Sequence, residues 1–498
     1  MRMKVKDVDI STGGIAVAII NSIDAEKLGT FKGDRVCVTK GKKSAVTIVD
    51  IAESSKVVPV GTVALFEEAL YQIGCREKDY VEVTLEKKPD SVVLIKKKMD
   101  GKRLAYHEIY EIMKDIVDNK LTDAEIAYFI CACYIHSLDL NEIVNLTRAM
   151  FDTGDILRLE PPVFDVHCIG GVAGNRTTPI IVPIAAAAGL IIPKTSSRAI
   201  TSPAGTADTM EVITPVSFNI SQIGEIVKKT NGCLVWGGAV SLAPADDKII
   251  KLEYPMGIDA QAQLLASVIA KKKSVSATHV LIDIPVGRGS KMQDVRAAKN
   301  LKRQFMRIGA RMGMRFEVIL TDGCQPIGNG FGAVLEMRDI LRVLKNSPLA
   351  PLDLREKSLY MAGLLLEMGG KAKRGQGRAM AKNMLESGVA LKKFTEIIEA
   401  QGGKVPDENK IEAGKLTYVF PAYASGKIEH IDSTLISQIC RAAGTPRDKR
   451  AGLYLNKHKH EKVIVGEPLF TVYSDSKQKM QYAIEIVNKL GFDAIIIH

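Results

Sequence analysis

The stretch KTSSRAITSPAGTADTME, residues 194–211, combines several hydroxyl side chains, one arginine and an Ala-Gly-Thr turn in a segment with little apolar content. Hydroxyls, backbone N–H groups and a guanidinium are the short donors that a phosphate oxyanion requires around it. A second segment of this kind, FDVHCIGGVAGNRTTP at 164–179, lies just upstream. Because each segment stands between an apolar run and a helical pattern, the pair favours a phosphate-handling site over two ordinary loops.

The surrounding pattern is the alternation of strand, loop and helix that is typical of an α/β domain. Ligands of a parallel sheet bind beyond the carboxyl ends of its strands. The loops at 169–178, 195–206 and 286–291 are therefore expected to meet at one crevice. The predicted strands are 163–168, 190–193, 280–285 and 316–320, and the predicted helices are 178–188, 258–273 and 333–345.

The N-terminal segment contains an internal repeat. Leu28-Gly29 precedes an alternating strand at 35–39, and Ile73-Gly74 precedes a similar strand at 80–85, so the two copies are offset by 45 residues. Each copy predicts a short helix, a turn and a strand. Two such halves predict a pseudo-symmetric β-barrel.

Three helical segments follow, and their short loops favour an antiparallel bundle. The second begins at Thr122, a capping residue with Glu125 three positions on. We predict a multidomain α/β protein with an N-terminal pseudo-symmetric β-barrel, a small helical domain, a large α/β domain with a central sheet and a C-terminal α+β part. The predicted limits are 1–88 for the barrel, 95–158 with 245–274 for the helical domain, 160–240 with 275–415 for the α/β domain, and 416–498 for the last part.

The composition is that of a globular protein of 498 residues, 46% hydrophobic and 25% charged. No apolar run reaches the roughly 18 residues that span a membrane, and the N-terminal alternation predicts a strand rather than a signal peptide. The eight cysteines are scattered without a CxxC pair, and no HExxH motif occurs. We therefore expect a reduced cytoplasmic protein with free thiols and without structural zinc.

The formal net charge of +11 permits binding of nucleic acid, but the basic side chains are spread among 57 acidic ones. Aromatic residues make up only 5%, too few for a stacking platform. A basic enzyme that attracts an anionic substrate accounts for the charge equally well. We expect no nucleic-acid or membrane partner; a nucleic-acid-binding protein is the non-enzyme alternative, and a steep salt dependence of DNA binding would reveal it.

At its loops the sequence resembles the thymidine/pyrimidine nucleoside phosphorylase superfamily, and within it most closely the archaeal AMP phosphorylases. The resemblance runs from Tyr106 to about Ser474 and includes KLEYPMGIDAQAQLLASVIAKKK at 251–273. The first ninety or so residues match an extension that pyrimidine phosphorylases lack. The resemblance implies that the protein binds two small-molecule substrates, AMP and inorganic phosphate, and converts them into adenine and ribose 1,5-bisphosphate. The resemblance implies no cofactor. It also implies a homodimer or larger homo-oligomer.

The sequence departs from the nucleoside phosphorylases at two places. Those enzymes have Lys-His-Ser where this chain has Val166, His167 and Cys168, so a phosphate-binding lysine is missing. They also place an arginine on the pyrimidine base, in the segment aligned with Leu252, and this chain has no arginine there. Both departures favour a purine nucleotide over a pyrimidine nucleoside as the substrate. CMP and UMP are not excluded as further substrates.

The resemblance implies that Asp259 is the general acid that protonates the leaving adenine. From the residues alone, the cap is the favoured interpretation of Asp259. A helix N-terminus also lowers the pKa of a carboxyl group, so burial beside the base has to raise that pKa again. The implied nucleotide-binding residues are Gly171, Ser197, Arg198, Ala199, Ile200, Thr201, Ser202, Thr206, Ser267 and Lys291; additional candidates are His167, Ser196 and Lys271.

Several of these residues have a second interpretation. Lys271 shares a helix face with Ser267, whereas Lys272 and Lys273 are expected only to be solvated at the helix end. Lys291 suits a 5′-phosphate because its ammonium is flexible, and His167 could instead be a core histidine. Two enzyme alternatives stay open: a pyrimidine nucleoside phosphorylase, and a phosphoribosyltransferase of the anthranilate type in which Asp246-Asp247 would bind magnesium.

Overall fold

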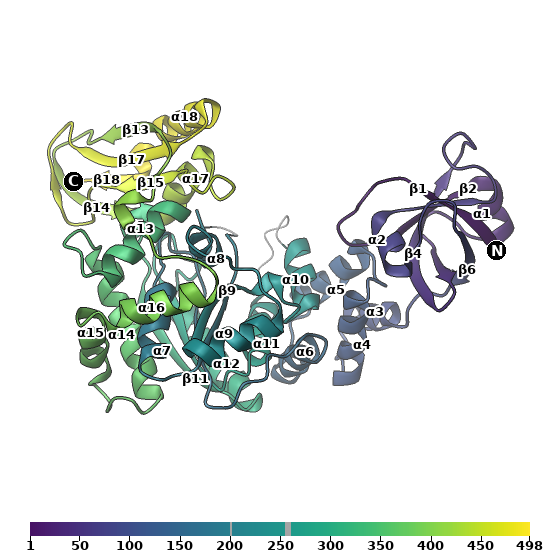
Figure 1. Cartoon of the computed structure of the whole chain (residues 1–498), viewed down its shortest axis with the longest axis horizontal. Helices are drawn as coiled ribbons and strands as arrows, with labels where there is room; N and C mark the ends of the chain where they lie inside the picture. Colours follow the sequence, from purple (N-terminus) through teal and green to yellow (C-terminus); the bar gives the residue numbers. More distant parts are fainter. Residues whose placement is uncertain (200–201, 254–259) are drawn as a thin grey trace. The chain divides into compact units, whose positions relative to one another are not determined.

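The chain divides into two units, Met1–Gly154 with Ala243–Val268 and Asp155–Leu242 with Ile269–His498. The computed structural model describes residues 1–199, 202–253 and 260–498 (Figure 1). Among these residues, no helix has the length and apolar character that crossing a membrane requires.

The predicted N-terminal barrel is confirmed: six strands close in the order β1-β5-β2-β4-β3-β6. Figure 1 shows the barrel in purple, next to the N-terminus. The parallel pairs β1–β5 and β4–β2 are equivalent under the repeat. Gly29 and Gly74 end the two short helices in the left-handed conformation that favours glycine. The elements are β1 (Arg2–Asp7), β2 (Val17–Asn21), α1 (Ser22–Leu28), β3 (Arg35–Lys40), β4 (Lys43–Ala52), β5 (Thr62–Leu65), α2 (Glu67–Ile73) and β6 (Tyr80–Glu86).

The helical bundle belongs to the same unit. Thr122 and Glu125 form the predicted capping box, with each side chain accepting the other's backbone N–H. The buried Arg35 of the barrel donates from Nε to the carbonyl oxygen of Lys120 at 3.0 Å and forms an ion pair with Glu125. The bundle consists of α3 (Ser91–Met99), α4 (Tyr106–Val117), α5 (Asp123–Ile135), α6 (Leu140–Asp152) and α10 (Pro244–Glu253).

The α/β part of the second unit contains two small parallel sheets. One has the order β11-β10-β7 and the other is the pair β8-β9; a single bridge between Val163 and Ile191 joins β7 to β8. The strands are β7 (Phe164–Cys168), β8 (Ile192–Ser196), β9 (Gly232–Trp236), β10 (His279–Val286) and β11 (Arg315–Asp322).

Apolar helices bury these sheets. The side chains of α7, α13 and α14 form one continuous core with β7 and β8, which is what near-continuous apolar runs predict for a covered parallel sheet. The helices of this unit are α7 (Thr178–Ala187), α8 (Thr206–Met210), α9 (Ile220–Thr230), α12 (Val295–Arg311), α13 (Ala333–Leu344), α14 (Leu352–Met368), α15 (Gly377–Glu386) and α16 (Val389–Ala400). Helix α11 (Gln261–Ser274) begins in the first unit and ends in the second.

Two predicted elements have different limits. The strand expected at 190–193 occupies 192–196, because Gly189 is left-handed and the Leu190 N–H still donates to the Ala185 carbonyl at the end of α7. Ser196 therefore ends a strand instead of lying in a loop. The helix expected at 258–273 is described from Gln261, and residues 258 and 259 lie outside the described residues.

The C-terminal part is α+β, as predicted. One sheet has the order β12-β15-β17-β13 and a second has the order β16-β14-β18, and Figure 1 shows α17 and α18 beside them. The elements are β12 (Gly330–Phe331), β13 (Leu416–Pro421), β14 (Gly426–Ile431), α17 (Ser433–Ala443), β15 (Gly452–Leu455), β16 (Lys462–Val463), β17 (Pro468–Ser474), α18 (Lys477–Ala494) and β18 (Ile495–Ile497).

Candidate functional site

The three loops predicted to follow strand ends, 169–178, 195–206 and 286–291, lie against one another. Gly171 has φ +94°, and a Cβ there would lie 2.2 Å from the backbone nitrogen of Lys291. Loops 169–178 and 286–291 are therefore in backbone contact, at a distance that only glycine allows. Arg176 joins the first loop to the hydroxyl-rich one, because its Nη2 donates to Ser202 Oγ at 3.4 Å.

Two carboxylates shape the hydroxyl-rich loop. Arg198 donates to both carboxylate oxygens of Glu211, at 2.7 and 2.8 Å, and to Asp208 at 3.0 Å. Asp208 Oδ2 also accepts the backbone N–H groups of Ala199 and Gly205. Hydrogen bonds from Arg198 lower the pKa of Glu211 to about 2. In this structure the Arg198 guanidinium thus holds its own loop in shape.

The guanidinium of Arg198 also lies over the Trp236 ring, 4.7 Å from its centroid. A Cβ on Gly205 would lie 2.5 Å from the Ser197 carbonyl oxygen, so glycine lets α8 begin directly on the loop. Thr206 is the first residue of that helix.

The loop hydroxyls differ in their partners. Ser196 Oγ is buried and has no hydrogen-bond partner among the described residues, whereas Ser202 Oγ donates to the Ala204 carbonyl at 2.7 Å. A buried hydroxyl without a partner is costly unless a ligand or water completes it. Ile200 and Thr201 lie outside the described residues, and so does Asp259.

A buried charge cluster underlies the glycine loop. The Asp165 carboxylate lies 2.8 Å from the Lys272 ammonium and 3.5 Å from that of Lys194, and all three side chains are at most 6% exposed. The expectation that Lys272 is merely solvated is therefore wrong, because β7 places a carboxylate within its reach. Burial lowers the pKa of Lys194 to about 7, and the neighbouring Lys272 charge acts in the same direction.

This cluster contains two lysines and one carboxylate, and the lysine charges act on His167. Burial holds the pKa of His167 well below its ordinary value, and the charges of four lysines, Lys272, Lys194, Lys291 and Lys271 in decreasing order, add to the effect. The imidazole is therefore neutral at pH 7 and can act as a hydrogen-bonding group but not as a cation. The four lysines whose charges act on His167, near the end of β7, favour an anionic ligand.

Ser267 belongs to the other unit. Its Oγ donates to Asp246 Oδ2 at 2.7 Å, and Asp246 is buried. Ser267, the candidate nucleotide-binding serine, thus lies on α11 next to the Asp246 carboxylate. From the sequence, Asp246 was a candidate only for binding magnesium.

A fourth loop supports the glycine loop. The Ile327 N–H donates to the Ala173 carbonyl at 3.0 Å, and a Cβ on Gly174 would lie 2.1 Å from the Ile327 carbonyl oxygen. Asp339 Oδ2 accepts the N–H groups of Asn329 and Gly330, both at 2.7 Å. This supporting role was not predicted, because Asp339, the residue that fixes the loop, lies on the helix α13 further along the chain.

Asp339 makes stability depend on pH. Burial raises the pKa of its carboxyl to about 7, so the folded chain binds this proton more tightly than the unfolded chain, and the group's contribution to stability falls as pH rises from about 4 to 7. Asp339→Asn keeps an acceptor oxygen but does not titrate. We therefore expect the difference between the melting temperature of Asp339→Asn and that of the unchanged protein to become steadily more positive as the pH rises from about 4 to 7. A constant difference between pH 4 and 8 would show that Asp339 is ionised throughout.

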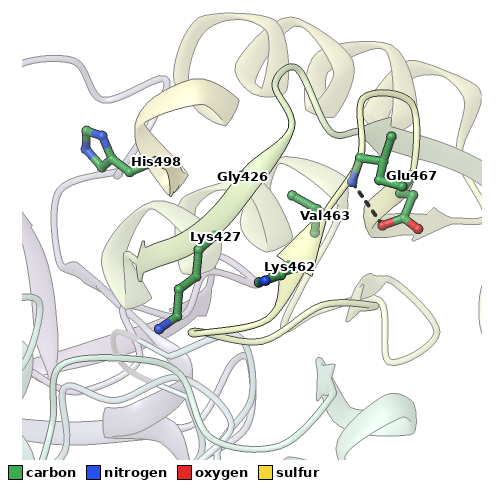
Figure 2. A pocket seen from close by; sticks show the side chains of 7 residues that line it. Gly426, Lys427, Lys462, Val463, Glu467 and His498 are labelled. Carbon is green, nitrogen blue, oxygen red and sulfur yellow. Dashed lines mark hydrogen bonds between the residues drawn. The ribbon is translucent and has the colours of Figure 1, made fainter.

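A separate cavity of about 540 Å³ lies in the C-terminal part. Figure 2 shows Lys427 of β14, Lys462 of β16 and Glu467 at its wall, with Glu467 accepting the Ile464 N–H at 3.3 Å. Its lining includes none of the residues predicted to bind nucleotide.

The chain matches three families along its length. Residues 92–154 match the family described as "Glycosyl transferase family, helical bundle domain", and residues 160–391 match "Glycosyl transferase family, a/b domain". Residues 427–490 match the "Pyrimidine nucleoside phosphorylase C-terminal domain".

Similar proteins cover almost the whole chain. The AMP phosphorylase of Thermococcus kodakarensis is 45% identical over 98% of this chain and 97% of its own length. The AMP phosphorylase of Methanocaldococcus jannaschii is 42% identical over 98% and 96%. Among solved structures, the anthranilate phosphoribosyltransferase of Thermus thermophilus has a TM-score of 0.53 at 19% identity, covering 62% of this chain and 99% of that one, which shows a shared fold.

Proposed function

The chain belongs to the AMP phosphorylase family, and from this we infer that it catalyses the phosphorolysis of AMP. Inorganic phosphate and AMP give adenine and ribose 1,5-bisphosphate, so the enzyme is a pentosyltransferase. The observation that carries this conclusion is the 42–45% identity to AMP phosphorylases over about 98% of the chain. The convergence of two phosphate-type loops supports it independently.

The reaction is a displacement at C1′ of the ribose. A phosphate oxygen forms a bond to C1′ while the bond from C1′ to the base nitrogen breaks, and the bonding pair leaves with adenine, which takes up a proton. The loops around Ser196 and Ser202 supply hydroxyl and N–H donors for phosphate. Binding of the anion favours the protonated form of Lys194, whose pKa is about 7. The ammonium groups of Lys194 and Lys272 then stabilise the anion, in place of the lysine that is missing at Val166.

The site residues are our proposal. Asp259 is the general acid toward adenine, and Lys291 holds the 5′-phosphate. The remaining substrate-binding residues are Gly171, Ser197, Arg198, Ala199, Ile200, Thr201, Ser202, Thr206 and Ser267, with His167, Ser196 and Lys271 as additional candidates. Backbone contact between Gly171 and Lys291 supports their assignment to one site.

The enzyme alternatives have less support. The anthranilate phosphoribosyltransferase shares the fold at 19% identity, which carries no argument about activity. If the chain were a pyrimidine nucleoside phosphorylase, it would lack the family's lysine at Val166 and its arginine near Leu252. Of the three family matches, only that of residues 427–490 is described as pyrimidine nucleoside phosphorylase.

Phosphate-dependent release of free base, measured on AMP, CMP, UMP, adenosine and thymidine, tests the proposal. We expect AMP to be cleaved and adenosine and thymidine to react poorly, while the rates with CMP and UMP define the base range. Release of thymine or of adenine from the nucleosides at rates equal to AMP would overturn it.

We further propose a cytoplasmic homo-oligomer with the domain limits 1–88, 95–158 with 245–274, 160–240 with 275–415, and 416–498. The separate apolar core of the barrel supports its independence. None of the proposed site residues lies in it.

Deletion of residues 1–86 is expected to leave a folded protein with reduced but detectable activity. The barrel closes on its own core and contacts the bundle through Arg35, Lys120 and Glu125, so its loss should mainly remove interface burial and lower the melting temperature. Light scattering should show a smaller assembly. An unchanged mass would exclude a role in assembly, and an unfolded product would show that the rest of the chain needs the barrel.

A further inference from the structure

Arg176 lies in the glycine loop just before α7, and its side chain is only 9% exposed. Its Nε donates to Glu336 Oε2 at 2.6 Å, its Nη1 to the Asn175 carbonyl at 3.5 Å and its Nη2 to Ser202 Oγ at 3.4 Å. The guanidinium therefore spans the distance from its own loop to the hydroxyl-rich loop. Among the described residues, no other hydrogen bond joins loop 169–178 to loop 195–206.

Glu336 fixes the guanidinium in place. Its side chain, on the first turn of α13, is 1% exposed. It also accepts from Thr209 Oγ1 of α8 at 2.9 Å and from the Gly332 N–H at 3.3 Å. Burial raises the pKa of this carboxyl and the Arg176 charge opposes that rise. One buried carboxylate thus joins the glycine loop, α8 and α13 at a single point.

We propose that Arg176, held by Glu336, is a positioning residue that sets the spacing between the two phosphate loops and thereby the affinity for inorganic phosphate. The inference rests on the proposed function, in which phosphate is a substrate. Donors from both loops must converge on one oxyanion, and a misplacement of about 1 Å in such a site can cost on the order of 10²-fold. Arg198 is bound within its own loop by Asp208 and Glu211 and does not provide this link.

Steady-state kinetics with Arg176→Met test the proposal. Methionine keeps part of the apolar stem and removes every donor. We expect the KM for phosphate to rise about 10-fold or more, the KM for AMP to change less than about threefold, and Arg176→Lys to show an intermediate KM for phosphate. Ser202→Ala should also raise the KM for phosphate. The double variant should be no worse than the more damaged single variant, because both changes break the same contact.

A matched control is Lys345→Met, which breaks the 2.5 Å ion pair between Lys345 and Glu408 at the other end of α13. It should lower the melting temperature without changing either KM. The proposal is overturned if Arg176→Met raises both KM values equally, or only lowers the melting temperature. If Arg176→Met does not fold, an unchanged KM for phosphate in Ser202→Ala overturns it. Absence of adenine release by the unmodified protein would instead refute the proposed function.

Discussion

Replacement of Asp259 by asparagine is expected to lower kcat for AMP by roughly 10²–10⁴-fold with little change in melting temperature. Adenine leaves readily only as a protonated base, and asparagine cannot supply that proton. Asparagine caps a helix nearly as well as aspartate. The substitution therefore distinguishes a role of Asp259 as general acid from a role as helix cap. The measurement is kcat for adenine release at saturating AMP and phosphate, together with a thermal melt.

Asp139→Asn is the matched control, since Asp139 is an N-cap whose carboxylate accepts the N–H groups of Asn141 and Glu142. It should leave kcat unchanged. Near-normal turnover by Asp259→Asn would assign Asp259 to the structural role of a cap, and a loss shared by both variants would point to a change in folding.

AMP is expected to be preferred over adenosine by on the order of 10⁴-fold in kcat/KM. A site built for a charged phosphate leaves its buried polar groups unpaired when a neutral sugar binds, and such sites reject the neutral analogue strongly. Lys291→Ala should reduce kcat/KM for AMP by about 10- to 100-fold, because a hydrogen bond to a charged group contributes roughly 1.5–3 kcal/mol. The weak activity on adenosine should be unchanged.

Lys299→Ala removes another exposed lysine side chain, from the neighbouring helix α12, and serves as the control for net charge. Equal losses on AMP and adenosine in Lys291→Ala would mean that Lys291 does not bind the 5′-phosphate. An equal loss in Lys299→Ala would attribute the effect to long-range attraction of the anion.

Local sequence patterns predicted the elements well where one physical rule dominated. The 45-residue repeat predicted the barrel because each copy places a glycine, Gly29 or Gly74, between a short helix and a strand, where the turn needs left-handed backbone. Thr122 and Glu125 marked a helix start because such a pair caps a helix through reciprocal hydrogen bonds. The strand at 190–193 was misplaced because the turn that closes α7 includes Leu190, whose N–H donates to the Ala185 carbonyl. The pattern of apolar residues does not distinguish a helix end from a strand start.

The site was harder to predict because its supports come from distant positions. Lys272 looked like a solvated residue in a run of three lysines, and only the fold brings it to Asp165, more than a hundred residues earlier in the chain. Glu336 similarly reaches Arg176 from a different element. A charged residue inside an apolar strand pattern, such as Asp165 or Lys194, was the signal in the sequence that a buried charge cluster existed.

The most direct test of AMP phosphorolysis is the stoichiometry of the products. The purified protein is incubated with AMP and inorganic phosphate, adenine is quantified by chromatography, and the sugar phosphates are followed by phosphorus NMR. We predict one ribose 1,5-bisphosphate for each adenine released and each phosphate consumed, with no release when phosphate is omitted. Formation of ribose 5-phosphate, or adenine release that does not depend on phosphate, would contradict this activity.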